Sequence, residues 1–152
     1  LVSLTDLSLS FENAKSITNR GMEALAQGIQ HLSQLSHCTL VFEDLSQVDG
    51  VGVSKIGEAF QNLTFLSSVR ICFRGLSVID YLTGFLDTRK QFKSQAKITI
   101  YLPKLAKDSK EMKELLRTKH IDKKFICLYF IDFIWGPFLR NSFQFNFREF
   151  PL

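Results

Sequence analysis

The same pattern of apolar residues occurs three times in the chain at a constant spacing. Leu4, Leu7, Leu9 and Phe11 are followed by Leu35, Cys38, Leu40 and Phe42, and then by Leu66, Val69, Ile71 and Phe73. In each copy apolar and polar residues alternate, which is the pattern of a β-strand with one buried face. A short strand that returns at a fixed interval cannot bury its apolar face alone, so we expect a stack of similar units.

The second half of each unit changes from an alternating to a helical spacing. Met22, Leu25, Ile29 and Leu32 are spaced as on one face of a helix, and they align with Val53, Ile56, Phe60 and Leu63 in the second unit. Each unit is therefore predicted to be a strand followed by a helix. This order predicts an α/β fold in which parallel strands form an inner sheet and the helices lie outside.

The first unit resembles a known repeat. The segment LTDLSLSFENAKSITNRGMEALAQGIQHLSQL resembles leucine-rich repeats of the ribonuclease-inhibitor-like and cysteine-containing classes, in which an LxxLxL strand leads through ITDxGLxxLA into a helix. The matching residues are Leu4, Leu7, Leu9, Ile17, Thr18, Asn19, Gly21, Met22, Leu25 and Ala26. The chain also resembles the long, degenerate leucine-rich arrays of single-celled eukaryotes. The resemblance implies a solenoid with a curved parallel sheet inside and helices outside.

Two features depart from that family. The position after the strand that usually holds Asn or Cys holds Glu12, Glu43 and Arg74, so no buried asparagine ladder is expected. The distance from Leu4 to Leu35, and again from Leu35 to Leu66, also exceeds the roughly 20 to 29 residues of typical leucine-rich repeats. A wider turn after each strand is the expected consequence.

Residues 1–120 are predicted to form the repeat domain, with units at about 4–34, 35–65, 66–94 and 95–120. Ile79, Leu82, Phe85 and Leu86 indicate a third helix in a shifted frame, and the segment AKITIYLP indicates a fourth strand that ends at Pro103. A fourth helix should follow. Its expected N-cap is Asp108 with Glu111 as the capping-box partner, and Met112, Leu115 and Leu116 should face inward.

Residues 121–152 form a different, phenylalanine-rich segment, for which a capping or irregular structure is expected. Eight of the 15 phenylalanines lie between Phe125 and Phe150. The apolar run at 125–139 contains Asp132 and is shorter than the roughly 20 residues of a membrane-spanning helix. A strand covering the open end of the array, an interfacial anchor and an out-of-frame tail remain alternatives.

Charge is segregated along the chain. Residues 1–88 hold five basic and nine acidic residues, whereas residues 89–124 hold twelve basic and four acidic residues. Such a basic block could contact nucleic acid or anionic lipid. Its acids are interleaved at helical spacing, however, which favours a solvated helix face. Nucleic acid is therefore not expected as a partner, and attachment to a membrane surface through the block and the phenylalanine-rich segment stays an alternative.

The stretch DGVGVSKIGEAF at Asp49 to Phe60 is rich in glycine, as phosphate-binding loops are, but it does not match their patterns. A dinucleotide fingerprint needs its third glycine where Lys55 stands, and a Walker loop needs Gly-Lys-Ser/Thr where Gly57 is followed by Glu58. Gly52 takes the repeat position of Gly21, and Gly57 takes that of Ala26. The glycines are therefore interpreted as close-packing positions of a second helix.

No catalytic or metal-binding pattern stands out. His31, His37 and His120 lie in no recognised spacing, and Cys38 and His37 should point to opposite faces of a strand. We therefore expect no enzymatic activity, no cofactor, no metal and no small-molecule substrate. Cys38, Cys72 and Cys127 are odd in number, and no signal peptide is recognised, which favours a reducing, cytoplasmic setting. A first residue other than Met indicates a piece of a longer protein.

The strand residues that alternate with the inward leucines should line the concave face of the sheet. They are Asp6, Ser8, Ser10, His37, Thr39, Val41, Ser68, Arg70, Cys72, Lys97, Thr99 and Tyr101. Solenoids bind partners on such a face, so the predicted function is protein–protein interaction. The alternatives are a regulatory or targeting fragment of a larger multidomain protein and peripheral membrane attachment.

Overall fold

The structure is a computed structural model, and it describes residues 3–74, 78–89, 91–103, 109–118 and 126–131. In these ranges strands and helices alternate, with a fifth strand after the last helix. In chain order they are β1 Asp6–Glu12, α1 Asn19–Ile29, β2 His37–Glu43, α2 Gly50–Phe60, β3 Ser68–Arg74, α3 Val78–Arg89, β4 Lys97–Pro103, α5 Lys110–Thr118 and β5 Ile126–Ile131.

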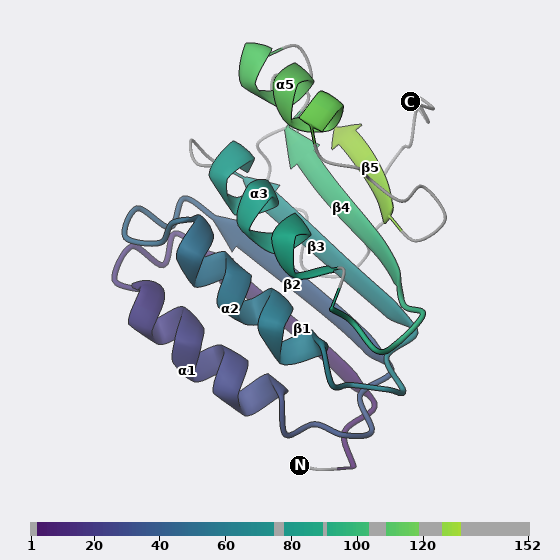
Figure 1. Ribbon diagram of the computed structural model, residues 1–152. Coiled ribbons are helices and arrows are strands. Elements are labelled where there is room, and N and C mark those ends of the chain that lie inside the picture. The colour runs from purple at the N-terminus through teal and green to yellow at the C-terminus, as the bar shows by residue number, and fades with distance from the viewer. Residues whose placement is uncertain (1–2, 75–77, 90, 104–108, 119–125, 132–152) are drawn as a thin grey trace.

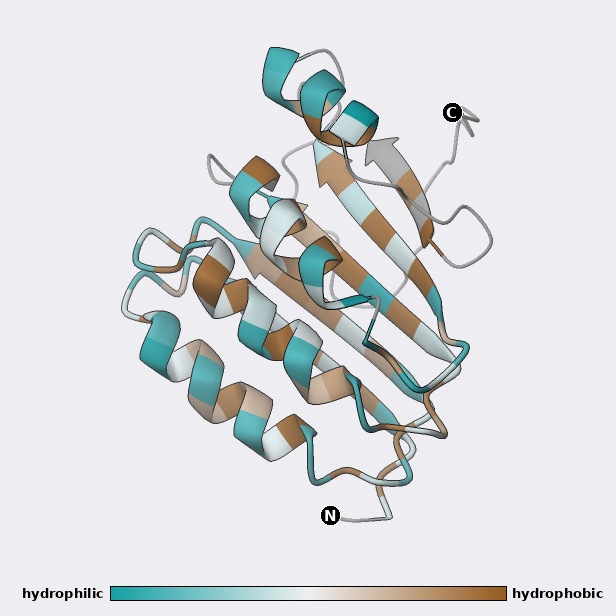
Figure 2. Cartoon of the chain, in the orientation of Figure 1, coloured by the Kyte–Doolittle hydropathy of each residue, from teal (hydrophilic) through white to brown (hydrophobic). Residues whose placement is uncertain are grey.

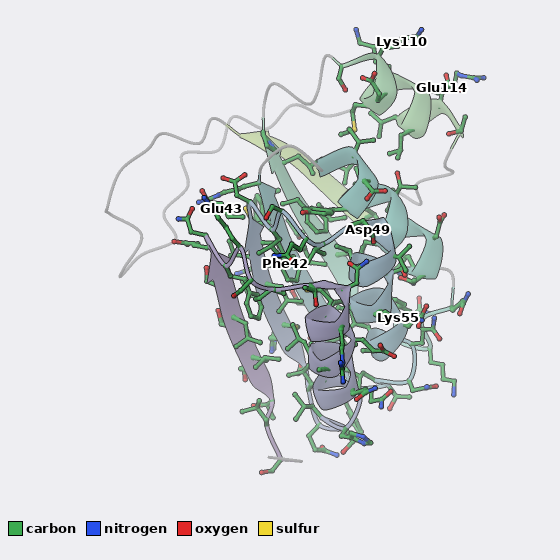
Figure 3. The ribbon with its side chains drawn as sticks, turned by 90° about the vertical axis from the view of Figure 1, so that its left-hand side faces the viewer. Phe42, Glu43, Asp49, Lys55, Lys110 and Glu114 are labelled. Carbon is green, nitrogen blue, oxygen red and sulfur yellow. The ribbon has the colours of Figure 1, made fainter. Side chains whose placement is uncertain are left out.

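The five strands form one parallel sheet in the order β1-β2-β3-β4-β5. Helices α1, α2 and α3 lie side by side over one face of this sheet (Figure 1). None of the described helices covers the opposite face, which we call the open face (Figures 1 and 3). The predicted α/β fold with a parallel sheet alternating with helices is therefore confirmed.

The repeat spacing of the sequence is also the register of the sheet. Leu9 pairs with Leu40 and Leu40 with Ile71. Residues at the same position of consecutive repeats are therefore direct neighbours on adjacent strands. The step to β4 is slightly shorter, since Ser68 pairs with Lys97. Figure 2 shows the resulting alternation of apolar and polar residues along β3 and β4. The predicted strand at β4 is confirmed, because Ile98, Ile100 and Leu102 are all fully buried.

The sheet continues past residue 120, the predicted end of the repeat domain. Ile126 and Leu128 of β5 pair with Ile98 and Ile100 and are buried like them. Of the alternatives for the phenylalanine-rich segment, a strand at the end of the sheet is the one observed for Ile126–Ile131. Residues 132–152, on which the other expectations for this segment fall, lie outside the described residues.

The core between sheet and helices contains a ladder of aromatic rings. Phe42 stacks on Phe11 with ring centroids 5.7 Å apart and on Phe73 at 6.0 Å. Phe73 in turn contacts Tyr81 of α3, whose hydroxyl donates a hydrogen bond of 2.9 Å to the carbonyl oxygen of Leu45. The repeat therefore aligns one ring on each of β1, β2 and β3, and Tyr81 of α3 continues the ladder.

The turns that follow β1 and β2 share a backbone conformation. Asn13 and Asp44, which follow β1 and β2, have φ angles of 54° and 49°. Asn and Asp adopt this left-handed conformation more readily than most residues.

The helix N-termini are tied to their neighbours. The Asp49 carboxylate caps α2 by accepting hydrogen bonds from the N–H groups of Val51 and Gly52. The Asn19 side chain of α1 exchanges two hydrogen bonds with Asp49, at 2.9 and 3.1 Å. In the first unit the equivalent cap residue is Thr18, which makes no side-chain cap bond.

This difference predicts unequal costs for two equivalent substitutions. We expect Asp49→Ala to lower the free energy of unfolding by about 1–2 kcal/mol, because it removes a working N-cap. Thr18→Ala should cost clearly less, because Thr18 makes no cap bond to lose. Urea denaturation of both variants measures the two values, and equal losses would contradict the assigned caps. These hydrogen bonds lower the pKa of Asp49, so its contribution is present above the carboxyl's ordinary pKa and is lost as the pH falls through the lowered one.

The fourth helix begins one residue later than predicted. Helix α5 starts at Lys110, and the hydroxyl of Ser109 accepts a hydrogen bond of 3.0 Å from the N–H of Met112. Ser109 therefore supplies the cap, and the predicted N-cap, Asp108, lies outside the described residues. Serine and aspartate side chains both place an oxygen where it can accept a hydrogen bond from the helix N-terminus. The sequence alone therefore does not show which of the two adjacent residues is the N-cap. Met112 and Leu115 are buried, as predicted, and Leu116 is half-buried.

Candidate binding surface on the open face of the sheet

The twelve residues predicted to contact a partner all belong to β1, β2, β3 or β4 and alternate with the core residues. The strand register places them in three rows that run across the strands. The first row is Asp6, His37, Ser68 and Lys97, the second is Ser8, Thr39, Arg70 and Thr99, and the third is Ser10, Val41, Cys72 and Tyr101. The fold therefore brings the whole predicted set together on the open face.

The first two rows are polar and mostly accessible. Asp6, His37, Arg70 and Lys97 are exposed, and Nδ1 of His37 lies 3.3 Å from a carboxylate oxygen of Asp6. The acidic group stands on β1, whereas Arg70 and Lys97 stand on β3 and β4. These two rows thus form a polar surface whose charge changes sign across the sheet.

The third row differs from the prediction. Val41 and Cys72 are each only 6% exposed, and Tyr101 is half-buried. The two buried side chains offer almost no surface to a partner, although their place in the alternating pattern is the same as that of Thr39 and Arg70. The open face is therefore polar and accessible in its first two rows, whereas Val41 and Cys72 in the third row are buried.

A fourth row, which was not among the predicted binding residues, follows the third. Glu12, Glu43 and Arg74 lie in register at the ends of their strands. The Arg74 guanidinium donates a hydrogen bond of 3.0 Å to Glu43, and both side chains are only 15% exposed. The sequence signal was present, because these positions continue the alternation two residues beyond the third row. The comparison with leucine-rich repeats explains these positions only as replacements for an asparagine ladder.

The two buried cysteines are poor nucleophiles. Burial raises the pKa of Cys38 to about 12 and that of Cys72 to about 11, with Arg74 partly opposing the shift at Cys72. Both are free thiols, and a protonated thiol neither attacks a substrate nor binds a metal. Cys38 points into the core and His37 lies exposed on the open face, so the two do not form a dyad. No group of three or more potential metal ligands occurs among the described residues.

These shifts predict slow thiol chemistry in the folded protein. At pH 8 we expect Cys38 and Cys72 to react with a maleimide at least about a hundredfold more slowly than in urea, since both burial and protonation oppose attack. Because the folded-state pKa values are raised, their contribution to stability is complete below the ordinary thiol pKa and is lost as the pH rises toward 11 and 12. Site-resolved mass spectrometry measures the rates. Fast labelling of either residue in the folded protein would contradict its burial.

The glycine-rich stretch is a packing site. Built side-chain atoms at Gly52 and Gly57 would overlap Asn19 and Thr88 of the adjacent helices. The N–H groups at the start of α2 are already bound to carboxylates, with Gly50 donating to Asp80 and the next two residues to Asp49. A phosphate placed there would meet two acidic groups instead of free donors. The interpretation of these glycines as close-packing positions is therefore confirmed.

The described part of the basic block carries mixed charge. On α5 the exposed residues Lys110 and Lys113 alternate with acids, and Glu114 pairs with Arg117 at 2.7 Å. Figure 3 shows Lys110 and Glu114 close together on that helix. Residues 104–108 and 119–125 of the block lie outside the described residues.

Among the residues that the structure places, no helix is long and apolar enough to cross a membrane. Comparisons of the chain with protein-family models, with curated proteins and with solved structures returned no match.

Proposed function

We propose that this protein is a non-catalytic module that binds another protein through the open face of its sheet. The observation that carries the proposal is the pair of polar rows from Asp6 to Lys97 and from Ser8 to Thr99, which no described helix covers. Parallel sheets usually have both faces covered, so two exposed polar rows that no described helix covers need a reason. Binding of a partner supplies one.

The rows present a fixed pattern to such a partner. Neighbouring strands lie about 4.8 Å apart, so side chains of one row are held at a regular spacing by the sheet. The charge runs from Asp6 on β1 to Arg70 and Lys97 on β3 and β4. The matching partner is a folded protein surface with a basic patch beside an acidic one, since complementary charge sets orientation and association rate.

The proposed architecture is a leucine-rich-repeat solenoid whose units differ slightly in length. Its support is the strand–helix unit, the constant register step between β1, β2 and β3, and the sequential strand order. The Glu43–Arg74 pair occupies positions where that family usually has Asn or Cys. A reducing, cytoplasmic setting is proposed with it, on the free thiols of Cys38 and Cys72.

Charge reversal tests the binding role. Asp6→Lys combined with Arg70→Glu inverts the two ends of the charge pattern, and both residues are exposed, so the fold should persist. We expect at least about a tenfold weaker capture of the protein partner, because like charges then face each other across the interface. Pull-down from cell extract followed by titration with the purified partner measures the loss.

The matched control lies on the helix face. Lys55 and Glu58 of α2 form an exposed pair at 2.9 Å, and Lys55→Glu with Glu58→Lys inverts that pair at constant net charge. This variant should bind the partner normally. Unchanged binding of the open-face variant, or an equal loss in the control, would contradict the proposal.

A further inference from the structure

Several apolar residues of the first unit are partly exposed, whereas the residues at the same positions of the second unit are buried. Eight apolar residues of the first unit are only partly buried, and the residue at the same position of the second unit is in every case no more than 5% exposed. Examples are Leu9 against Leu40 and Leu25 against Ile56. The second unit lies between the first and the third, whereas the first unit has a described neighbour, the second unit, on one side only.

The backbone of β1 has the same one-sided arrangement. In the described sheet β1 pairs with β2 alone and forms one edge. An edge strand leaves every second N–H and carbonyl group available for a further strand. β1 is thus a strand with a half-exposed apolar face and one edge at which no described strand pairs.

Helix α1 adds an independent indication. At Gly52 of α2 the adjacent helix leaves no room for a side chain, because Asn19 fills that space. Gly21 holds the same repeat position in α1, but an added Cβ there would meet nothing closer than Ile17, at 3.4 Å. Gly28 has nothing within 4 Å. The side of α1 that faces away from α2 therefore carries glycines with open space around them. Glycines at these positions would allow a further helix to pack closely against α1.

We propose that the outer edge of the first unit, formed by β1 and by the side of α1 that carries Gly21, is an interaction surface that receives another strand–helix unit of the same repeat, in parallel register and as part of the same array. The repeat itself specifies this occupant, since the second unit receives the first in that way. The inference does not depend on the binding role proposed for the open face.

A second copy of the protein fits this edge less well. Two-fold pairing of β1 with β1 about Leu9 would run antiparallel and place Asp6 opposite Glu12 twice. Like charges directly opposite each other destabilise a strand pair. A parallel unit avoids this arrangement and repeats the packing already seen between β1 and β2.

The test adds the missing neighbour. A variant carries a duplicate of residues 4–34 directly ahead of Leu4, so that the added strand can pair with β1. Hydrogen exchange of the β1 amides is compared in the extended and the unmodified protein. We expect at least about a tenfold slowing in β1, because exchange then requires the added unit to open.

Two matched variants separate packing from mere attachment. In the first, Leu7→Asp and Leu9→Asp are made in the duplicate only, and β1 should exchange as fast as in the unmodified protein. In the second, Gly21→Gln is made in the receiving helix. It should be tolerated in the unmodified protein, where the space is open, and should abolish the slowing in the extended one.

Three results would overturn the proposal. One is unchanged exchange in β1 when the added unit is folded, and another is equal slowing with the aspartate variant. The third is protection of β1 in the unmodified protein that rises with concentration, which would assign the edge to a second copy. Should the duplicate of residues 4–34 fail to fold, residues 35–65 are placed in the same position and the same outcomes apply.

Discussion

Replacing Gly57 by valine is expected to lower the free energy of unfolding by about 3 kcal/mol or more, because the new side chain has no space. Gly57 is buried in α2, and an added Cβ would overlap the hydroxyl oxygen of Thr88 and lie 2.8 Å from its Cβ. Helices α2 and α3 also touch closely at Gly84, where an added Cβ would overlap the backbone of Gly50. Moving α3 away to make room at Gly57 would therefore break this second contact. Chemical denaturation followed by circular dichroism measures the loss.

Two comparisons show whether the loss comes from this contact. Thr88→Ala should reduce the cost of Gly57→Ala, giving a favourable coupling in a double-mutant cycle. Lys55→Ala, two residues away but with a side chain that is 40% exposed, should leave the melting temperature unchanged (Figure 3). A large loss at Lys55, or no coupling with Thr88, would contradict the packing role of this stretch.

Phe42→Ala is expected to cost about 3–5 kcal/mol, as for other fully buried aromatic side chains. Its ring is sandwiched between Phe11 and Phe73, so the substitution leaves a cavity between two stacked neighbours. The collapse of this cavity is limited because the strands are fixed in register on both sides. Thermal and urea denaturation of the purified variant provide the measurement.

Phe11→Ala is the matched control at the end of the same ladder. Phe11 is half-buried and, among the described residues, its ring stacks on Phe42 alone, so a smaller loss of about 1–2 kcal/mol is expected from the area it buries. The ratio of the two losses reports the stacking of the units. Equal losses would mean that the outer edge of the first unit is covered in solution.

The strands were predictable because two signals agree. The alternation in LSLSF fixes which side chains face the core, and its return at a constant spacing fixes the pairing of β1, β2 and β3. A slip by one residue would move every core side chain to the open face, so the register has no close competitor. Helical spacing likewise located the core residues of α1, α2 and α3.

What the sequence did not predict depends on contacts between units. The alternation assigns Val41 and Cys72 to the open face correctly, but it contains no information on how closely the surrounding groups cover them. The Glu43–Arg74 pair likewise requires two strands to be in register before it can form. The sequence does not single out a strand at β5, because its segment lacks the following helix that marks the earlier units.

The most direct test of the binding role is site-specific photo-cross-linking in cell extract. A photoreactive residue is placed at Thr39 or Arg70 on the open face, and at Gln27 or Ser54 on the helix face, in otherwise identical protein. The account predicts that one protein partner is cross-linked from both open-face positions and from neither helix-face position. Cross-linking of that partner from the helix face alone would contradict it.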